Sequence, residues 1–156
     1  MFKNKQLEFN INGNILEVAD FTWWINKINS IYVDQKPIMR NDFSIFIETD
    51  NETDMLYWTS SSFKKIMKEF TNLCNGINEE NGSFGICGSK CFNFNNAQDI
   101  QYVKYFNANE PCYFVQIKFK SGKIFEWDFV SEEQLKILLT NFNKVKEIDN
   151  NVGLQQ

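Results

Sequence analysis

The segment ETDNETD at positions 48–54 places four carboxylates within seven residues. Asp50, Glu52 and Asp54 alternate along it, as the first three ligands of an EF-hand calcium loop do. That loop also requires Gly at its sixth position and Glu at its twelfth, and this chain has neither there. The EF-hand pattern is therefore incomplete. A looser calcium site, a solvated hairpin tip and an acidic contact surface are the interpretations left open.

The four cysteines offer a second kind of metal site. Cys87 and Cys91 lie close together in CGSKC, and Cys74 and Cys112 would have to complete a tetrahedral zinc site. The C-x3-C spacing is less typical of zinc than C-x2-C. Cys74 and Cys112 also occupy apolar positions of an expected helix and strand, where free thiols are common. We predict free cysteines, with no metal and no cofactor.

The chain has no histidine. This removes the commonest general base, the usual Ser and Cys triads, and most catalytic zinc sites. Of the carboxylate pairs, Glu126 and Asp128 alternate outward on an expected strand, and Glu132 and Glu133 fall in a first helical turn, where the helix dipole favours them. The glycine-rich phosphate-binding motifs are also absent. We predict a protein that is not an enzyme.

The charge balance disfavours anionic partners. Sixteen basic residues against twenty acidic residues give a net charge of −4, and every basic residue except Arg40 is a lysine. Because bidentate recognition of guanine and phosphate favours arginine, we expect no direct binding of nucleic acid and none of membranes. No apolar run is long enough for a signal peptide or a membrane span, so we expect a cytoplasmic protein.

The elements that position these residues follow from hydrophobic periodicity. Alternation on both sides of Asn12-Gly13 predicts an N-terminal hairpin with a type I′ turn. Residues 23–33, WWINKINSIYV, are expected to form one strand, which Pro37 closes.

A second hairpin and a helix are predicted next. The apolar residues of DFSIFIE and MLYW share one face of that hairpin: Phe43, Ile45, Ile47, Leu56 and Trp58. The serines of TSSSFKK can cap a helix whose apolar stripe is Ile66, Met67, Phe70, Leu73 and Cys74. Gly76 fits the end of this helix.

The second half of the chain repeats this order. A strand closed by Pro111 precedes a hairpin in which Gly122 suits the left-handed position of a three-residue loop. That register pairs Ile117 with Phe125 and Val115 with Trp127. The inward residues of the hairpin would be Val115, Ile117, Phe119, Phe125, Trp127 and Phe129.

A capping box of Ser131 and Gln134 then predicts a second helix with Leu135, Leu138, Leu139 and Phe142 on its apolar stripe.

Together these patterns predict an α+β fold in a single domain, residues 1–156. An antiparallel sheet is built from a tandem β-β-β-α unit and carries two helices packed on it. The expected parts are an N-terminal hairpin 6–20, a first unit 22–75, a Gly/Asn/Cys linker or functional loop 76–97, a second unit 98–147 and a frayed tail 148–156. The first unit is expected to carry three extra loop residues, which belong to ETDNETD.

The leading functional hypothesis is a non-enzymatic protein-binding inhibitor from a phage or mobile element, acting on a host defence nuclease complex as anti-CRISPR proteins do. An acidic tip on a rigid hairpin would meet a protein partner with a basic or nucleic-acid-binding surface. Abundant Asn, Ile, Lys and Phe resemble the residue usage of AT-rich bacterial or phage genomes, so the expected location is the bacterial host cytoplasm. The predicted contact residues are Glu48, Asp50, Glu52, Asp54 and Trp23.

Two alternatives remain. A toxin-neutralising immunity protein would explain the same features. A nucleotide or small-ligand binding module would use a pocket between the two units, lined by the glycine-rich linker and by Trp23, Trp24, Tyr102 or Tyr105.

Overall fold

The computed structural model describes residues 7–35 and 42–154, without the side chains of 57–59 and 149–154. The predicted roles of Pro37 and of the Trp58 side chain therefore lie outside the described residues. The chain divides into two compact units, Met1–Asn93 and Phe94–Gln156. The union of these units in a single domain stays a prediction.

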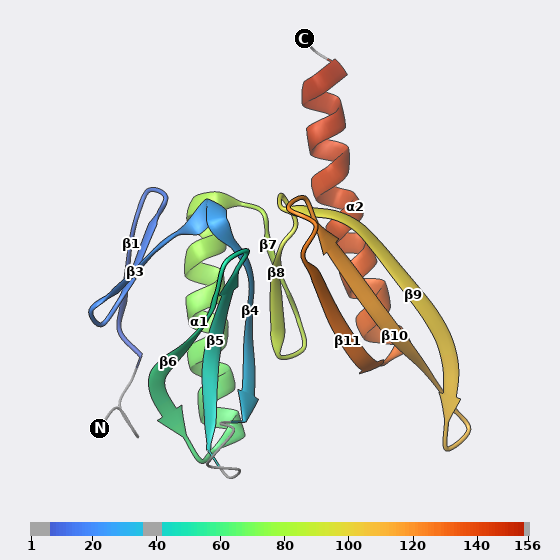
Figure 1. Cartoon of the computed structure of the whole chain (residues 1–156), viewed down its shortest axis with the longest axis horizontal. Coiled ribbons are helices and arrows are strands. Elements are labelled where there is room, and N and C mark those ends of the chain that lie inside the picture. Colours follow the sequence, from blue (N-terminus) through green and yellow to red (C-terminus); the bar gives the residue numbers. More distant parts are fainter. Residues whose placement is uncertain (1–6, 36–41, 155–156) are drawn as a thin grey trace. The chain divides into compact units, whose positions relative to one another are not determined.

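The described residues form antiparallel sheets and separate helices, as the α+β prediction requires (Figure 1). The first unit contains β1 (Phe9–Asn12), β2 (Ile15–Val18), β3 (Phe21–Trp24), a 3₁₀ turn (Ile25–Lys27), β4 (Ile28–Gln35), β5 (Phe43–Thr49), β6 (Thr53–Ser60), α1 (Phe63–Asn81), β7 (Phe84–Cys87) and β8 (Lys90–Asn93). The second unit contains β9 (Ala97–Asn107), β10 (Glu110–Phe119), β11 (Ile124–Val130) and α2 (Glu132–Leu154). In the described part of the chain, neither helix is long and apolar enough to cross a membrane.

The tandem β-β-β-α order is confirmed, as β4-β5-β6-α1 and then β9-β10-β11-α2. The strands of the described residues pair in three antiparallel sheets, ordered β1-β2-β3, β6-β5-β4-β8-β7 and β11-β10-β9. The two copies thus build two separate sheets, where the sequence predicted a common one. The reason lies in the hairpin β7–β8, which occupies the free edge of β4.

The N-terminal hairpin is confirmed, but its turn lies one residue later than predicted. Asn12 pairs with Ile15, so Gly13 and Asn14 form the turn. Of these two residues Gly13 alone has a positive φ (60°), which fits a type II′ turn and not the predicted type I′ turn. The single strand predicted over residues 23–33 is also wrong, because the 3₁₀ turn divides it into β3 and β4. Asn14 stabilises that break, since its carbonyl accepts a hydrogen bond from the Ile25 amide at 2.7 Å.

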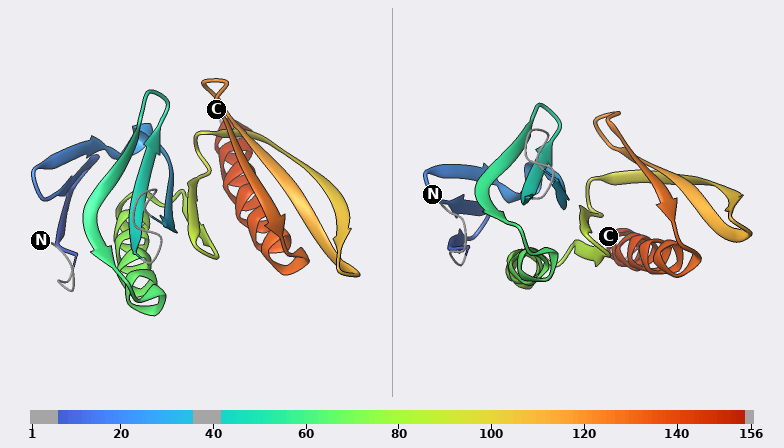
Figure 2. Two further views of the ribbon diagram at one scale, coloured as in Figure 1. Left: turned by 60° about the horizontal axis from the view of Figure 1, so that its bottom comes forward. Right: turned by 90° about the horizontal axis from the view of Figure 1, so that it is seen from below.

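The five-stranded sheet and α1 enclose the core of the first unit (Figure 2). Ile45, Ile47 and Leu56 are buried on the predicted face. The Ser62 hydroxyl accepts a hydrogen bond from the Lys65 amide at 3.3 Å, which confirms the predicted serine cap of α1.

The predicted end of α1 at Gly76 is wrong. The helix continues to Asn81 and ends at Gly82, whose φ of 69° is the left-handed conformation that favours glycine. A Cβ on Gly76 would lie 3.0 Å from the Phe9 ring, so this glycine permits close packing of β1 on the helix.

The predicted linker 76–97 is likewise corrected. It holds the end of α1 and the hairpin β7–β8, which buries Phe84 and Cys91 in the core of the first unit. The burial of these apolar side chains compensates for the weak strand propensity of its Gly and Asn residues.

The second hairpin has the predicted register. Ile117 pairs with Phe125 and Val115 with Trp127, and Gly122 has a φ of 96° in a three-residue loop. Pro111 does not close β9, because Ala108 and Asn109 form the turn and Pro111 lies within β10. Proline is tolerated there because β11 pairs with β10 only from Tyr113 onward.

Phe129 is not an inward residue as predicted. A bulge on β11 sets two of its residues, Asp128 and Phe129, against one residue of β10, so Val130 turns into the core and Phe129 is 64 % exposed with a φ of 55°. The Asp128 carboxylate holds this bulge, since it accepts hydrogen bonds from the Phe129 amide (2.8 Å) and the Tyr105 hydroxyl (2.6 Å).

The second helix begins as predicted and ends later. Ser131 and Gln134 exchange two hydrogen bonds of 3.1 Å, which is the capping box. Leu135 and Leu138 are buried on the predicted stripe. Residues 148–154, predicted to be a frayed tail, continue the helix, since no proline or earlier glycine interrupts it.

Candidate partner-binding surface at the β5–β6 hairpin

The segment ETDNETD joins β5 to β6 through a loop of three residues, Asp50, Asn51 and Glu52. The Thr49 amide donates to the Glu52 carbonyl at 2.9 Å and closes the loop. The loop that contains Gly122 is no shorter than this one, so the prediction of three extra loop residues is wrong.

Three of the four predicted carboxylates accept a hydrogen bond from a side chain on a neighbouring strand. Trp23 Nε1 of β3 donates to Asp54 at 2.8 Å. From β4, Asn29 Nδ2 donates to Asp50 at 2.6 Å, and the Tyr32 hydroxyl donates to Glu48 at 3.3 Å. The carboxylates are therefore held in position rather than freely solvated.

The carboxylates do not share one face of the sheet. Asp50 and Glu52 are exposed at the tip, whereas Glu48 and Asp54 are half-buried. Asp54 pairs with Ile47 and so lies on the core side, and Glu48, next to Ile47, points to the other side. The acidic surface thus consists of an exposed tip with one anchored carboxylate on each side.

Burial and Glu48 together change the acidity of the Tyr32 hydroxyl. Burial, followed by the charge and hydrogen bond of Glu48, raises the pKa of Tyr32 to about 12. The Tyr32 ring also stacks on Phe46, with centroids 5.4 Å apart. Tyr32 is therefore a neutral donor that fixes the Glu48 carboxylate at all ordinary pH values.

Trp23, one of the predicted contact residues, is 6 % exposed, whereas its neighbour Trp24 is 60 % exposed. Trp23 turns toward the core, where its indole donates to Asp54, so Trp24 is the exposed member of the pair. Whether either tryptophan contacts a partner stays a prediction.

Trp23 and Asp54 also line a small pocket at the edge of the core. Its volume is about 170 Å³, and its other lining residues are Phe21, Thr53, Met55 and Leu56. The Phe21 ring, 44 % exposed, stacks on Trp23 with centroids 6.1 Å apart and an interplanar angle of 27°. The pocket thus combines aromatic walls with a carboxylate.

The cysteines are not gathered as a zinc site would require. Cys74 and Cys91 are buried and hydrogen-bonded to each other, and burial raises the pKa of the Cys74 thiol well above its usual range. Cys87 is buried on β7, and Cys112 lies on β10 of the second unit. Among the residues that the structure describes, no group of three Cys, Asp or Glu side chains is arranged to hold a metal ion.

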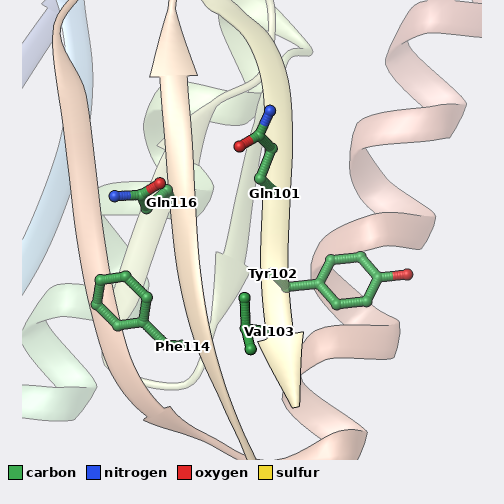
Figure 3. A pocket seen from close by; sticks show the side chains of 5 residues that line it. All are labelled: Gln101, Tyr102, Val103, Phe114 and Gln116. Atoms are coloured by element: carbon green, nitrogen blue, oxygen red, sulfur yellow. The ribbon is translucent and has the colours of Figure 1, made fainter.

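The second unit has a hollow of its own, of about 360 Å³, on β9 and β10. Gln101, Val103, Phe114 and Gln116 line it, and the Tyr102 ring, at its edge, points away from them (Figure 3). Its polar groups are two neutral amides, which offer hydrogen bonds but no charge.

Sequence reasoning missed the residues that hold the carboxylates, Asn29 and Tyr32, and the aromatic wall Phe21. The three donors Tyr32, Asn29 and Trp23 lie 16, 21 and 31 positions in the chain from the carboxylates that they hold. The only available signal was the run of polar and aromatic residues on β3 and β4, which flank the hairpin.

Comparison with known protein families, curated proteins and solved structures finds no match to this chain.

Proposed function

We propose that this protein is a non-enzymatic protein-binding inhibitor that contacts a basic surface of its partner through the β5–β6 hairpin. The observation that supports this is the anchoring of Glu48, Asp50 and Asp54 by side chains of β3 and β4. Anchored carboxylates lose little conformational entropy on binding, so more of their attraction for a cationic surface appears as affinity.

The partner we favour is a host defence nuclease complex, which makes the protein an anti-CRISPR-like inhibitor from a phage or mobile element. Nucleases present basic grooves to nucleic acid, and carboxylates at fixed positions can occupy such grooves in place of phosphates. The inhibitor would then act in the bacterial host cytoplasm and need no cofactor.

The experiment uses the full chain as an affinity reagent. Wild type and the tip variant Asp50→Asn/Glu52→Gln are used to capture partners from bacterial lysates, with Glu79→Gln/Glu80→Gln as the control. The control changes the net charge equally, at exposed positions of α1. A nuclease complex captured by wild type and control but not by the tip variant supports the proposal. Capture of no specific partner, or equal capture by the tip variant, contradicts it.

Inhibition is tested separately. Phage plaque counts are measured in strains that carry a defined nuclease defence, with each of the three proteins expressed. Wild type and control should restore plaques that the tip variant does not. A captured partner that is a toxin, whose lethality the protein abolishes, would instead establish the immunity-protein alternative.

The hollow on β9 and β10 favours the second alternative, a small-ligand module. Its volume of about 360 Å³ falls within the usual range for ligand sites. A thermal-shift screen with nucleotides, on wild type and Gln101→Ala, tests it. A ligand that stabilises only the wild type would support this function, and a uniformly negative screen would remove it.

A further inference from the structure

The pocket between β3 and β6 has the size of a single side chain. Its volume of about 170 Å³ is below the roughly 300–1,000 Å³ of small-molecule sites. It lies directly beside the acidic tip, because Thr53 and Asp54, which line it, follow Glu52 in the chain. A residue projecting from a partner that contacts the tip can therefore enter it.

Asp54 supplies the charge of this pocket. One of its carboxylate oxygens, Oδ2, accepts the Trp23 indole N–H at 2.8 Å, which fixes the orientation of the group. In the described part of the chain the other oxygen, Oδ1, has no partner. Because Asp54 is half-buried, a cationic donor to Oδ1 would be screened less by solvent than at the exposed tip.

The aromatic walls select the shape of that donor. Phe21 and Trp23 are stacked at an interplanar angle of 27°, and the Phe21 ring keeps 44 % of its surface exposed. A planar guanidinium can lie on such a ring and donate in its own plane to a carboxylate, whereas an ammonium group offers only a point charge.

We propose that this pocket binds one arginine side chain of the partner's basic surface, with the guanidinium on Phe21 and its N–H groups on Asp54. The inference rests on the proposed function, since it assigns the residue by which the basic partner is recognised. The exposed carboxylates of Asp50 and Glu52 would attract the partner, and the pocket would decide which cation enters.

The test uses the full-length protein labelled with ¹⁵N and three blocked tripeptides, Gly-X-Gly, in which X is arginine, lysine or citrulline. Citrulline has the shape of arginine without its charge. The readout is the indole N–H resonance of Trp23. We expect a saturable shift with the arginine peptide, weaker binding of the lysine peptide and none of the citrulline peptide.

Asp54→Asn is the decisive variant, because an amide oxygen can still accept the Trp23 indole N–H while the charge is lost. This variant should weaken the binding of the arginine peptide about tenfold. Asp99→Asn, at an exposed position of the second unit, is the control and should leave binding unchanged. A thermal unfolding curve establishes that both variants are folded.

The proposal is overturned if the arginine peptide gives no saturable shift, if citrulline or lysine binds as well as arginine, or if Asp54→Asn binds like the wild type. Its failure is distinguishable from that of the proposed function. Partner capture that depends on Asp50 and Glu52 but not on Asp54 contradicts the pocket alone. Arginine binding without any captured partner contradicts the proposed function alone.

Discussion

At the scale of single residues, the hydrogen bond between Trp23 and Asp54 joins the N-terminal sheet to the β5–β6 hairpin. Its donor is almost fully buried, whereas the adjacent Trp24 is largely exposed. The two tryptophans therefore provide a matched pair, with the same side chain in opposite environments.

We predict that Trp23→Phe lowers the free energy of unfolding by about 1–3 kcal/mol, because it leaves a half-buried carboxylate oxygen without its donor. Trp24→Phe should change it by less than about 0.5 kcal/mol, as exposed substitutions usually do. Chemical denaturation followed by circular dichroism measures both. Equal losses in the two variants would show that the Trp23 hydrogen bond contributes nothing specific.

Tyr32 gives a prediction on pH. Its pKa is raised from 10.0 to about 12 in the folded protein, first by burial and then by Glu48. A raised pKa stabilises the folded state fully below the unfolded value, and this contribution is lost as pH rises through the folded value. The free energy of unfolding should therefore fall between pH 10 and pH 12.

Comparison with Tyr32→Phe isolates this contribution, because lysines titrate in the same range in both proteins. Denaturant unfolding at several pH values between 10 and 12 should give a smaller decline for the variant than for the wild type. Glu48→Gln, which removes the second cause, should lower the pKa of Tyr32. Identical declines in wild type and Tyr32→Phe would contradict the assignment.

At the scale of elements, helix α1 ends at Gly82, whose amide donates to the Asn78 carbonyl at 2.7 Å. A Cβ at this position would meet no atom within 4 Å, so any effect of a substitution comes from the backbone. Because Gly82 has a φ of 69°, we predict that Gly82→Ala lowers the free energy of unfolding by about 1–2 kcal/mol.

Two other variants control this prediction. Gly82→Asn should lose less, since asparagine tolerates the left-handed conformation better than alanine does. Glu80→Ala, exposed in the last turn of α1, should be nearly neutral. Thermal and chemical unfolding of the four proteins give the order. An alanine variant as stable as wild type would mean that the end of the helix can rearrange.

The elements that the sequence predicted correctly are those decided by neighbours in the chain. The Ser62 cap, the capping box of Ser131 and Gln134, and the hairpin register around Gly122 each depend on spacings of a few residues. Periodicity alone also placed the buried stripes of both helices.

The features that the sequence did not predict are decided by distant contacts. The hairpin β7–β8 is two four-residue strands in a Gly- and Asn-rich segment, and it forms because β4 pairs with β8. The β11 bulge that exposes Phe129 lets Val130 enter the core. The side-chain donors to Glu48, Asp50 and Asp54 likewise come from strands that no local pattern connects to the hairpin.

At the scale of the whole molecule, each unit has buried residues of its own. The main apolar cluster runs from Leu7 to Cys91, so it lies wholly within the first unit. The second unit, Phe94–Gln156, has the size at which a domain buries only about 60 % of its surface and is marginally stable by itself.

We therefore predict that a fragment of residues 1–93 folds cooperatively, whereas a fragment of residues 94–156 is less stable than the first.

A fragment of residues 1–83 is the control for the boundary. It lacks β7 and β8, and so loses the strand that pairs with β4 and the buried Cys91 and Phe92. Circular dichroism during thermal unfolding, with limited proteolysis, should rank 1–93 well above 1–83. Because the β5–β6 hairpin ends at Ser60 and its donors come before it in the chain, the folded 1–93 fragment should also retain the Trp23–Asp54 hydrogen bond. An unfolded 1–93 fragment, or a 1–83 fragment of equal stability, would show that the core is not organised around the β4–β8 pairing.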